Sequence, residues 1–493
     1  MQHQPILAAI DLGSNSFRLQ VARVEGEQLY MLDGLREHVR LAAGLTPEKY
    51  LDAEAQQRAL TALSHFAERL RGLPREAVRA VGTNSLRVAK NAADFIPQAE
   101  HVLGFPIDVI AGIEEARLIY LGVAHGLPQS SDNRLVMDIG GGSTEFIIGK
   151  GLTPLKLESL YMGCVSFSHR FFPDGGVTKQ RLKQAELAAR AELQTISADF
   201  SSQNWDIALG SSGSARILCD ILEENGISER GITREGLEWL RNELLRAGNV
   251  QNLAGLPGLK AERVPVLAGG FSIMYAAFCE LGIERMQPAL GALREGVLYD
   301  LWGRFHHNDM REVTVQQFMR RYHVDMAQAE RVSQLALFFA REFLGEDAGE
   351  SALQLLEWAA KLHEIGISVA HGGYHKHTAY ILANADMPGF SKREQAALSL
   401  LALAQRGNLE KLGEVSLTAE DAACILSLRL AVLFCRSRGN SRLPVLRGKF
   451  SGTKFHILLD AAWLEDNPLS KTALQDERKP WKNRGFSLQV LAE

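Results

Sequence analysis

Two acidic, glycine-containing turns are the parts of this chain best suited to chemistry. The first follows an apolar run and reads Asp11-Leu-Gly13-Ser-Asn15; the second reads Asp138-Ile-Gly140-Gly-Gly142-Ser-Thr-Glu145. Small residues leave backbone N–H groups accessible, so that a phosphate can approach the main chain closely. An aspartate at the end of the preceding strand can hold a metal ion against that phosphate. The two turns therefore predict a phosphate-handling site.

The surrounding residues predict the elements that carry these turns. Each turn lies between an apolar run and a second alternating segment, which covers 17–21 in the first copy and 146–148 in the second. This pattern is typical of a strand, a tight turn and a returning strand. One such turn would be weak evidence, because a glycine-rich hairpin is more often only a turn. Two copies favour two duplicated α/β lobes with a cleft between them.

Further strands and helices alternate through the first half of the chain. We expect helices over 50–73 and 114–125, and strands over 78–81, 107–110, 207–209 and 264–267. From 314 to about 438 long amphipathic helical patterns dominate, and short β-like segments follow Gly439. These changes of pattern predict four domains, covering 1–125, 126–305, 306–438 and 439–493.

Length and composition restrict the class of protein. A chain of 493 residues is too long for one hydrophobic core. Its five cysteines are scattered without a C-x-x-C pair, which argues for a reducing compartment and against a zinc or disulfide framework. The longest uncharged stretch, 264–279, is shorter than the roughly 20 residues of a spanning helix. The first residues show no basic-then-apolar segment, so we expect no secretory signal. We expect a cytoplasmic protein without a membrane span.

The charge is unevenly distributed although the net charge is only −4. Residues 422–459 contain no Asp or Glu, but they contain seven cations: Arg429, Arg436, Arg438, Arg442, Arg447, Lys449 and Lys454. This basic stretch is either a solvated face or a groove that guides a long anion. Because aromatic residues are not interleaved for base stacking, a phosphate polymer is favoured over nucleic acid.

Seven segments together resemble the exopolyphosphatase / guanosine pentaphosphate phosphohydrolase family. They are Asp11-Leu-Gly-Ser-Asn-Ser, Gly112-Ile-Glu-Glu115-Ala-Arg, Asp138-Ile-Gly-Gly-Gly-Ser-Thr-Glu145, Met162-Gly-Cys-Val165, Gly291-Ala-Leu-Arg-Glu-Gly296, Leu362-His-Glu-Ile-Gly366 and Tyr374-His-Lys-His-Thr-Ala379. The resemblance covers nearly the whole chain and matches the long, four-domain members. It implies two actin-like (ribonuclease H-like) lobes, a helical HD-like domain and a small C-terminal α+β domain. It also implies Mg²⁺-dependent release of terminal orthophosphate, and we expect a homodimer.

The two turns and a few residues outside them have expected roles in this reaction. Glu115 matches the family's catalytic glutamate and would orient and deprotonate the attacking water. Asp138 and Glu145 would bind Mg²⁺, and Asp11 would share the metal or organise the first loop. The phosphates would contact Ser14, Asn15, Gly140, Gly141, Gly142 and Ser143. Four further residues match family positions near the substrate: Arg87, Cys164, Gly213 and Arg263.

The helical domain departs from the metal-binding pattern of HD phosphohydrolases. Gln328 stands where the first histidine is expected, the His-Asp pair is His363-Glu364, and the late aspartate is Val432. A binuclear metal site would lack ligands. We expect a non-catalytic domain that binds the substrate chain, with His371, His375 and His377 as polar contacts in a loop-rich segment.

Three functions remain open at this point. The leading hypothesis is a processive exopolyphosphatase, because the basic stretch suits a long polymer. A guanosine pentaphosphate 5′-phosphohydrolase would use the same water, metal and glycine turns. An actin-like nucleotide-binding module without hydrolysis is the third, but it would leave Glu115 without a purpose.

Overall fold

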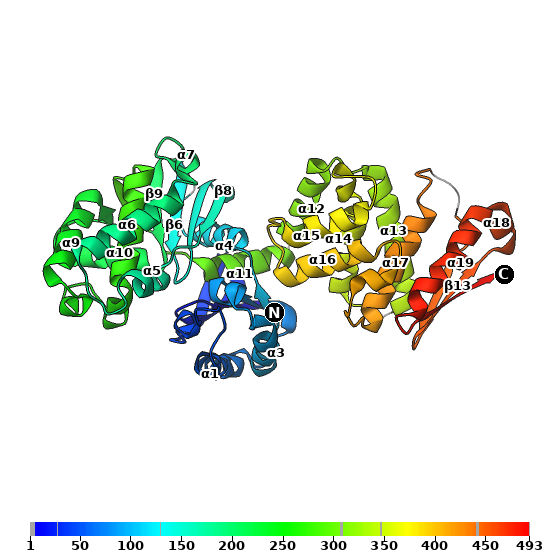
Figure 1. Cartoon of the computed structure of the whole chain (residues 1–493), viewed down its shortest axis with the longest axis horizontal. Coiled ribbons are helices and arrows are strands. Elements are labelled where there is room, and N and C mark those ends of the chain that lie inside the picture. The colour runs from blue at the N-terminus through cyan, green and yellow to red at the C-terminus, as the bar shows by residue number, and fades with distance from the viewer. Residues whose placement is uncertain are drawn as a thin grey trace. The chain divides into compact units, whose positions relative to one another are not determined.

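The computed structural model describes residues 5–26, 28–128, 130–305, 309–345, 348–439 and 443–492. The chain forms two compact units, Met1–Asp309 and Met310–Glu493. The first unit contains two mixed β-sheets with helices around and between them, and the second contains a group of helices and a small sheet (Figure 1).

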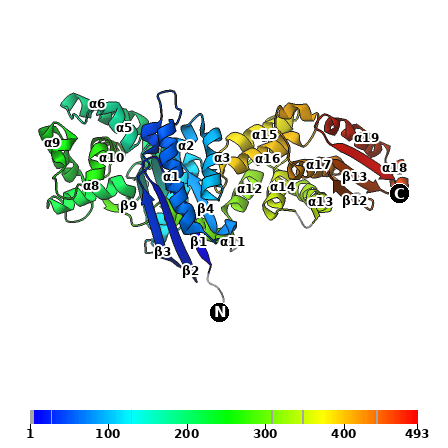
Figure 2. The same cartoon turned by 90° about the horizontal axis from the view of Figure 1, so that it is seen from below.

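The first sheet has the strand order β3-β2-β1-β4-β5. Its strands are β1 (Ile6–Leu12), β2 (Phe17–Glu25), β3 (Gln28–Glu37), β4 (Val78–Gly82) and β5 (Ile107–Val109). The β1, β2 and β3 strands form an antiparallel meander, while β4 and β5 continue the sheet in parallel with β1. Figure 2 shows the meander beside α1 (Ala53–Leu70).

The second sheet repeats this topology and adds one short strand, in the order β10-β11-β9-β6-β7-β8. Its strands are β6 (Asn133–Ile139), β7 (Thr144–Lys150), β8 (Thr153–Leu160), β9 (Ile207–Ser211), β10 (Ile232–Thr233) and β11 (Arg285–Pro288). The β6, β7 and β8 strands form the second meander, and β9 and β11 run parallel to β6. Each turn named above therefore joins the first two strands of its sheet, so the predicted duplication is present in the structure.

Two helices lie between the sheets and share one core with both of them. These are α4 (Gly112–His125) and α11 (Leu293–Phe305), drawn between the two sheets in Figure 1. Their apolar side chains pack with residues of β1, β4, β6, β7 and β9. The outer face of the first sheet is covered by α1 and α3 (Ala92–Leu103). The outer side of the second sheet carries α5 (Cys164–Phe171), α6 (Lys179–Leu193), α8 (Ser212–Glu224), α9 (Arg234–Ala247) and α10 (Leu267–Leu281).

The segment 264–267, expected as a strand, is helical. A 3-10 helix over Ala261–Val266 leads directly into α10, in which Gly269 and Gly270 pack closely against α5 residues instead of ending a strand. Within the described residues, Ala261–Leu281 is the one helical segment that is long and apolar enough, by length and composition alone, to cross a membrane. However, 72% of its most apolar window is buried inside the unit, as in a core helix.

The second unit has one continuous hydrophobic core. Its helices are α12 (Met310–Arg321), α13 (Met326–Leu344), α14 (Glu350–Lys361), α15 (Tyr374–Asn384), α16 (Lys392–Ala404) and α17 (Ala419–Phe434). A three-stranded sheet, ordered β12-β13-β14, follows with β12 (Arg447–Ser451), β13 (Lys454–Leu459) and β14 (Ser487–Ala492), and with α18 (Ala461–Asp466) and α19 (Pro468–Lys482). Phe455 and Trp481 join this sheet to the helical core.

Candidate active site

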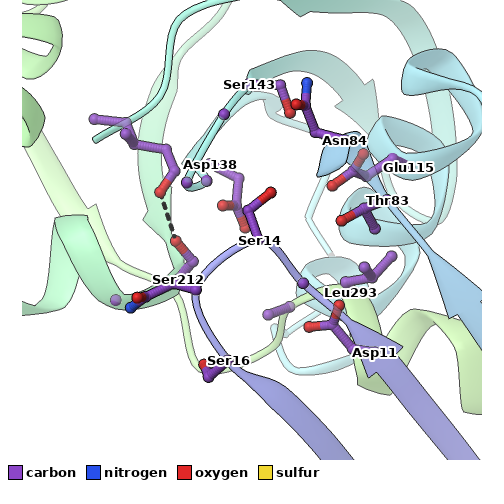
Figure 3. Close-up of a pocket in the computed structure, with 18 of the residues that line it drawn as sticks. Asp11, Ser14, Ser16, Thr83, Asn84, Glu115, Asp138, Ser143, Ser212 and Leu293 are labelled. Atoms are coloured by element: carbon purple, nitrogen blue, oxygen red, sulfur yellow. Dashed lines mark hydrogen bonds between the residues drawn. The ribbon is translucent and has the colours of Figure 1, made fainter. Parts of the chain in front are cut away.

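The loops that follow β1, β4, β6 and β9 meet at a cleft in the first unit. Ligands bind outside the carboxyl ends of strands in many α/β sheets, and here two such edges face one another. Figure 3 shows Asp11 and Ser14 from the first lobe opposite Asp138 and Ser143 from the second. The cleft is lined by Asp11, Gly13, Ser14, Asn15, Ser16, Arg18, Thr83, Asn84, Glu115, Ile119, Asp138, Ile139, Gly140, Gly141, Gly142, Ser143, Cys164, Ser212, Gly213, Arg263, Ala292, Leu293 and Arg294.

The duplicated hairpins differ in the charge of the residue that pairs with the turn aspartate. In the first hairpin Asp11 pairs in register with Arg18, and in the second Asp138 pairs with Glu145. The topologically equivalent position is thus a cation in one lobe and a carboxylate in the other. An anionic substrate with a bound cation needs both kinds of neighbour.

Glu115 lies on the first turn of α4 and faces the cleft (Figure 3). Its residue is 8% exposed, and Arg87 Nη1 lies 3.2 Å from its Oε2 atom. Burial raises the pKa of Glu115 to about 7, although Arg87 opposes this change and the negative charges of Asp11 and Asp138 support it. A carboxylate with a pKa near neutrality, held at a polar cleft, is suited to accept a proton from water.

The carboxylates of the second hairpin are buried close together. Asp138 is 5% exposed and Glu145 is 1% exposed, and Glu145 Oε1 accepts a hydrogen bond from Ser159 Oγ at 2.9 Å. Burial raises the pKa of both groups, and the charges of Glu115 and Asp138 raise that of Glu145 further. Burial also raises the pKa of Asp11 to about 6. Crowded carboxylate oxygens that repel one another are suited to a hard divalent cation.

The carboxylates alone do not complete a cation site. Across the described stretches of the chain, no three His, Cys, Asp or Glu side chains lie close enough together to hold a metal ion. Mg²⁺ usually keeps several water or phosphate ligands, so two carboxylates such as Asp138 and Glu145 are enough to provide its protein ligands.

The glycine turn lies in close contact with the opposite lobe. A Cβ atom at Gly142 would lie 2.5 Å from Asn84 Oδ1, and one at Gly141 would lie 2.8 Å from Ser14 Cβ. Ser14 in turn accepts a hydrogen bond from Ser85 Oγ at 2.8 Å. The N–H of Gly140 donates to the carbonyl oxygen of Ser143 at 2.9 Å and so closes the turn. Only glycine permits this approach of the two lobes.

Two arginines in the cleft were missed from the sequence. Arg18 follows the first turn on β2, and Arg294 belongs to the segment Gly291–Gly296 that carries part of the resemblance. Burial and the neighbouring Arg294 and Arg36 lower the pKa of Arg18 to about 10. The alternation of side-chain directions along β2 could have identified Arg18. The position of Arg294 inside a segment that carries the resemblance could have identified Arg294.

A second, connected cavity continues the cationic side of the cleft. We call it the cationic annex; it is lined by Arg18, Arg36, Ser212, Gly213, Arg216, Ile217, Asp220, Lys260, Glu262, Arg263, Leu290, Gly291, Ala292 and Arg294. Arg18, Arg263 and Arg294 line both the cleft and the annex. This annex extends the volume available to an anion beyond the carboxylates.

Ser212 was also missed, and its backbone is unusual. It begins α8 with φ at 62°, a left-handed conformation that is uncommon for a serine. Its Oγ atom donates to the carbonyl oxygen of Ile139 at 3.2 Å, shown as the dashed line in Figure 3. Such conformations cluster at functional sites, where surrounding contacts hold them in place.

Comparison with known proteins identifies the family. The model of the Ppx/GppA phosphatase family matches residues 20–305, and that of Ppx/GppA phosphatase domain III matches residues 310–478. The chain belongs to the Ppx/GppA phosphatase family. It is 38% identical to the guanosine-5′-triphosphate,3′-diphosphate pyrophosphatase of Pseudoalteromonas translucida, over 98% of each chain. Members are hydrolases that act on phosphoanhydride bonds, so this chain is such an enzyme.

Solved structures show that the phosphatase has an actin-like fold of mixed sheets and helices in its first unit. An exopolyphosphatase from Cytophaga hutchinsonii superposes with a TM-score of 0.55 at 23% identity, covering 60% of this chain and 98% of that one. The PPX-GPPA enzyme of Aquifex aeolicus superposes with a TM-score of 0.51 at 24% identity, covering 60% and 99%.

The cleft of the phosphatase contains most of the residues predicted for it. Cys164 is 3% exposed, and its pKa is raised by burial, so it contributes shape more than charge. Arg263 lies against the backbone of Gly213. Arg87 and Glu145 lie directly behind the lining, where they contact Glu115 and Ser159 respectively.

The residues of the second unit that depart from the HD pattern have protein partners. Gln328 donates to the carbonyl oxygen of Cys435 at 2.8 Å, and His363 is 1% exposed with its Nδ1 atom 2.6 Å from the carbonyl oxygen of Ala360. Arg438 forms ion pairs with Glu364 and Asp325. His375 and His377 lie within α15, so the expected loop-rich segment is partly helical.

The cations of the basic stretch do not form one continuous exposed surface. Arg429 is buried and paired with Glu477, Arg438 is paired as above, and Arg442 lies outside the described residues. Arg447, Lys449 and Lys454 are exposed, and the strand register places them on one side of the β12–β13 hairpin. We call these three residues the basic face.

Proposed function

We propose that this phosphatase releases terminal orthophosphate from a linear array of phosphates by attack of a water molecule held at Glu115. The observation that carries this proposal is the cleft itself, in which a buried glutamate with a raised pKa lines the same cavity as two aspartates, Asp11 and Asp138, and three arginines. This arrangement provides a proton acceptor and complementary charge for the equatorial phosphate oxygens.

The chain's own residues have separate tasks in this reaction. Glu115 orients the water and accepts its proton at Oε1 or Oε2, while Arg87 fixes the carboxylate from behind. Arg18, Arg263 and Arg294 bind the phosphates, and Ser14, Asn15 and the turn from Gly140 to Ser143 surround the terminal group. Asp138 and Glu145 would hold Mg²⁺, which when bound neutralises negative charge on the phosphate oxygens.

Inorganic polyphosphate is the leading substrate, and processive hydrolysis is our leading mode. The annex supports this choice because Arg36, Arg216 and Lys260 continue the positive charge beyond the cleft. In this proposal the second unit is an HD-like domain without its own metal chemistry, followed by a small C-terminal domain, with the four domains bounded as predicted from the sequence. We further propose a cytoplasmic homodimer.

Guanosine pentaphosphate is the second candidate, and the same annex gives it specific support. Asp220 and Glu262 also line the annex, and a carboxylate can accept hydrogen bonds from the N–H groups of guanine. Ile217 and Leu290 offer apolar contact for a base, and Leu290 is 82% exposed. The relative from Pseudoalteromonas, named for this nucleotide, matches over nearly its full length.

Orthophosphate release measured side by side on three substrates tests the proposal. Long-chain polyphosphate, guanosine pentaphosphate and adenosine pentaphosphate would be supplied at equal terminal-phosphate concentration with Mg²⁺. Release from the first two supports the proposed reaction. A preference for the guanosine over the adenosine compound supports base recognition in the annex. Failure to release phosphate from any of them would refute the proposed function.

A further inference from the structure

A buried ion cluster lies beneath α4, and the proposed reaction does not use it. It consists of Arg79, Glu114, Arg117 and Asp300, none of which is more than 7% exposed. Arg117 donates to both carboxylate oxygens of Glu114, at 2.7 and 2.8 Å, and also to Asp300. Arg79 donates to the other oxygen of Asp300, which also accepts from Arg304 Nε at 3.2 Å.

The cluster connects three elements that each supply residues to the cleft. Arg79 belongs to β4, which is followed directly by the cleft residues Thr83 and Asn84. Glu114 and Arg117 belong to α4, which carries Glu115. Asp300 belongs to α11, which begins with Leu293 and Arg294. Neither Arg79 nor Asp300 lines the cleft, so the cluster acts on the site only through these elements.

The contact between α4 and α11 is close enough to make them one rigid pair. A Cβ atom at Gly122 would overlap the carbonyl oxygen of Ala292, and one at Gly296 would overlap that of Leu118. At the other end of α4, His125 stacks on Tyr299 with ring centroids 3.7 Å apart. The glycines set the distance between the two helices. The directional hydrogen bonds of the ion cluster prevent α4 from rotating or sliding along α11.

The energetics of buried ions favour a positioning role over simple stabilisation. Replacing a buried ion cluster with well-packed apolar side chains is often neutral or stabilising, because desolvation offsets most of the attraction. Directional hydrogen bonds, in contrast, hold a helix at one position. Misplacement of a catalytic group by about 1 Å can cost roughly 100-fold in rate.

We propose that Asp300 is a positioning residue for Glu115, acting through Arg117 and Arg79 to hold the first turn of α4 at the reacting water. This inference rests on the proposed function, since it takes Glu115 as the proton acceptor. Asp300 is the central residue of the ion cluster because its two carboxylate oxygens accept hydrogen bonds from different elements. One oxygen accepts from Arg117 of α4, and the other accepts from Arg79 of β4.

The test compares Asp300→Asn with a matched control, Glu186→Gln. Glu186 is 8% exposed and bound by Arg241 at 2.8 Å between α6 and α9, and it lines neither the cleft nor the annex. We expect Asp300→Asn to lower kcat roughly 10- to 100-fold with KM changed less than about threefold. We expect Glu186→Gln to leave kcat within about twofold of the original enzyme. Arg117→Lys is a milder second variant if Asp300→Asn does not fold. It keeps the positive charge but loses the bidentate hydrogen bonds of the guanidinium group.

Hydrogen–deuterium exchange of peptides from 111–125 gives a readout that does not need activity. Faster exchange there in Asp300→Asn, together with the loss of kcat, supports the proposal. Unchanged kcat in a folded Asp300→Asn or Arg117→Lys, or an equal loss in Glu186→Gln, overturns it. If the unmodified enzyme hydrolyses no substrate, the proposed function fails, and unchanged exchange would separately show that Asp300 does not hold α4.

Discussion

Glu114 and Glu115 are neighbours on one helical turn, but their surroundings give them different chemistry. Glu114 is bound by the Arg117 guanidinium inside the ion cluster, whereas Glu115 faces the cleft with a pKa raised by burial to about 7. At the scale of single residues, therefore, the environment decides which carboxylate can accept a proton.

Glu115→Gln should abolish turnover while substrate affinity stays within a few-fold of normal. The substitution removes the proton acceptor but preserves the size of the side chain, and loss of a general base typically costs about 10²–10⁴ in rate. Orthophosphate release and equilibrium binding of polyphosphate would be measured together. Near-normal turnover on both proposed substrates would exclude Glu115 as the base.

Mg²⁺ should stabilise the folded protein more at pH 8 than at pH 5. Glu115 and Asp11 have pKa values raised to about 7 and about 6, and those of Asp138 and Glu145 are raised as well. A carboxyl whose pKa is raised by folding holds its proton longer in the folded state, so metal-free stability falls as the pH rises through 5 to 7. A cation bound to the ionised groups relieves this loss.

Thermal unfolding with Mg²⁺ and with EDTA at the two pH values would measure this effect. The shift in Tm at pH 8 should shrink in Glu145→Gln, which removes one proposed ligand. Equal shifts at both pH values in the unmodified protein would contradict the carboxylate site.

At the scale of elements, the arrangement of the site follows from repeated strand ends and from two central helices. The four cleft loops follow equivalent strands in the two sheets, and α4 and α11 pack between those sheets. Because both helices contribute residues to the cleft, their separation sets the width of the site. Gly122 and Gly296 are the residues that permit this separation.

Gly122→Ala should destabilise the protein by about 1–3 kcal/mol, the usual effect of overpacking a core. The added methyl group would overlap the backbone of α11. Gly126→Ala is the matched control, because it ends the same helix at φ −81° and its Cβ would have its nearest contact at 3.5 Å. Urea unfolding of both variants measures the difference. Equal stability of the two would show that the helices can separate without a cost in stability.

At the scale of the whole molecule, the second unit supplies charge and structure without an evident metal site in its described residues. Arg438 places a fixed cation beside Glu364, where an HD phosphohydrolase would use an acid to bind metal. The basic face, in contrast with Arg429 and Arg438, consists of exposed side chains on the β12–β13 hairpin. It is the natural candidate for contact with a long polyanion.

Changing Arg447, Lys449 and Lys454 together to Gln should weaken binding of long polyphosphate and make its salt dependence shallower. A polyanion held by fewer cations releases fewer counterions on binding, so the slope of log K against log salt becomes smaller in magnitude. Guanosine pentaphosphate should be affected much less, since the cleft and annex of the first unit can account for all of its phosphates.

Binding of both substrates across a salt series would test the basic face. The control changes three exposed lysines elsewhere, Lys179, Lys183 and Lys471, to Gln. An equal decrease in affinity for both substrates, or the same decrease in the control, would show that the basic face is an ordinary solvated surface and does not bind the polymer specifically.

Local patterns in the sequence were sufficient for the elements around the two turns. The apolar runs that end at Asp11 and Asp138 predicted both hairpins because strand alternation and turn chemistry act between near neighbours. The same local logic predicted the helix that carries Glu115. It was wrong at 264–267, where an apolar segment with glycines forms the start of a buried helix, because short apolar runs do not distinguish a strand from a core helix.

The tertiary structure alone added Arg18 and Arg294 to the site. Arg18 and Arg294 are separated by most of the first unit in sequence, but two sheet edges and α11 bring both to one cleft. The ion cluster joins Arg79 to Asp300 in the same way. Ion pairs also separate the cations of the basic stretch from one another. Arg429 pairs with Glu477 and Arg438 pairs with Glu364, and both glutamates lie outside the stretch in sequence. Such contacts depend on long-range packing and burial, which composition and spacing along the chain do not specify.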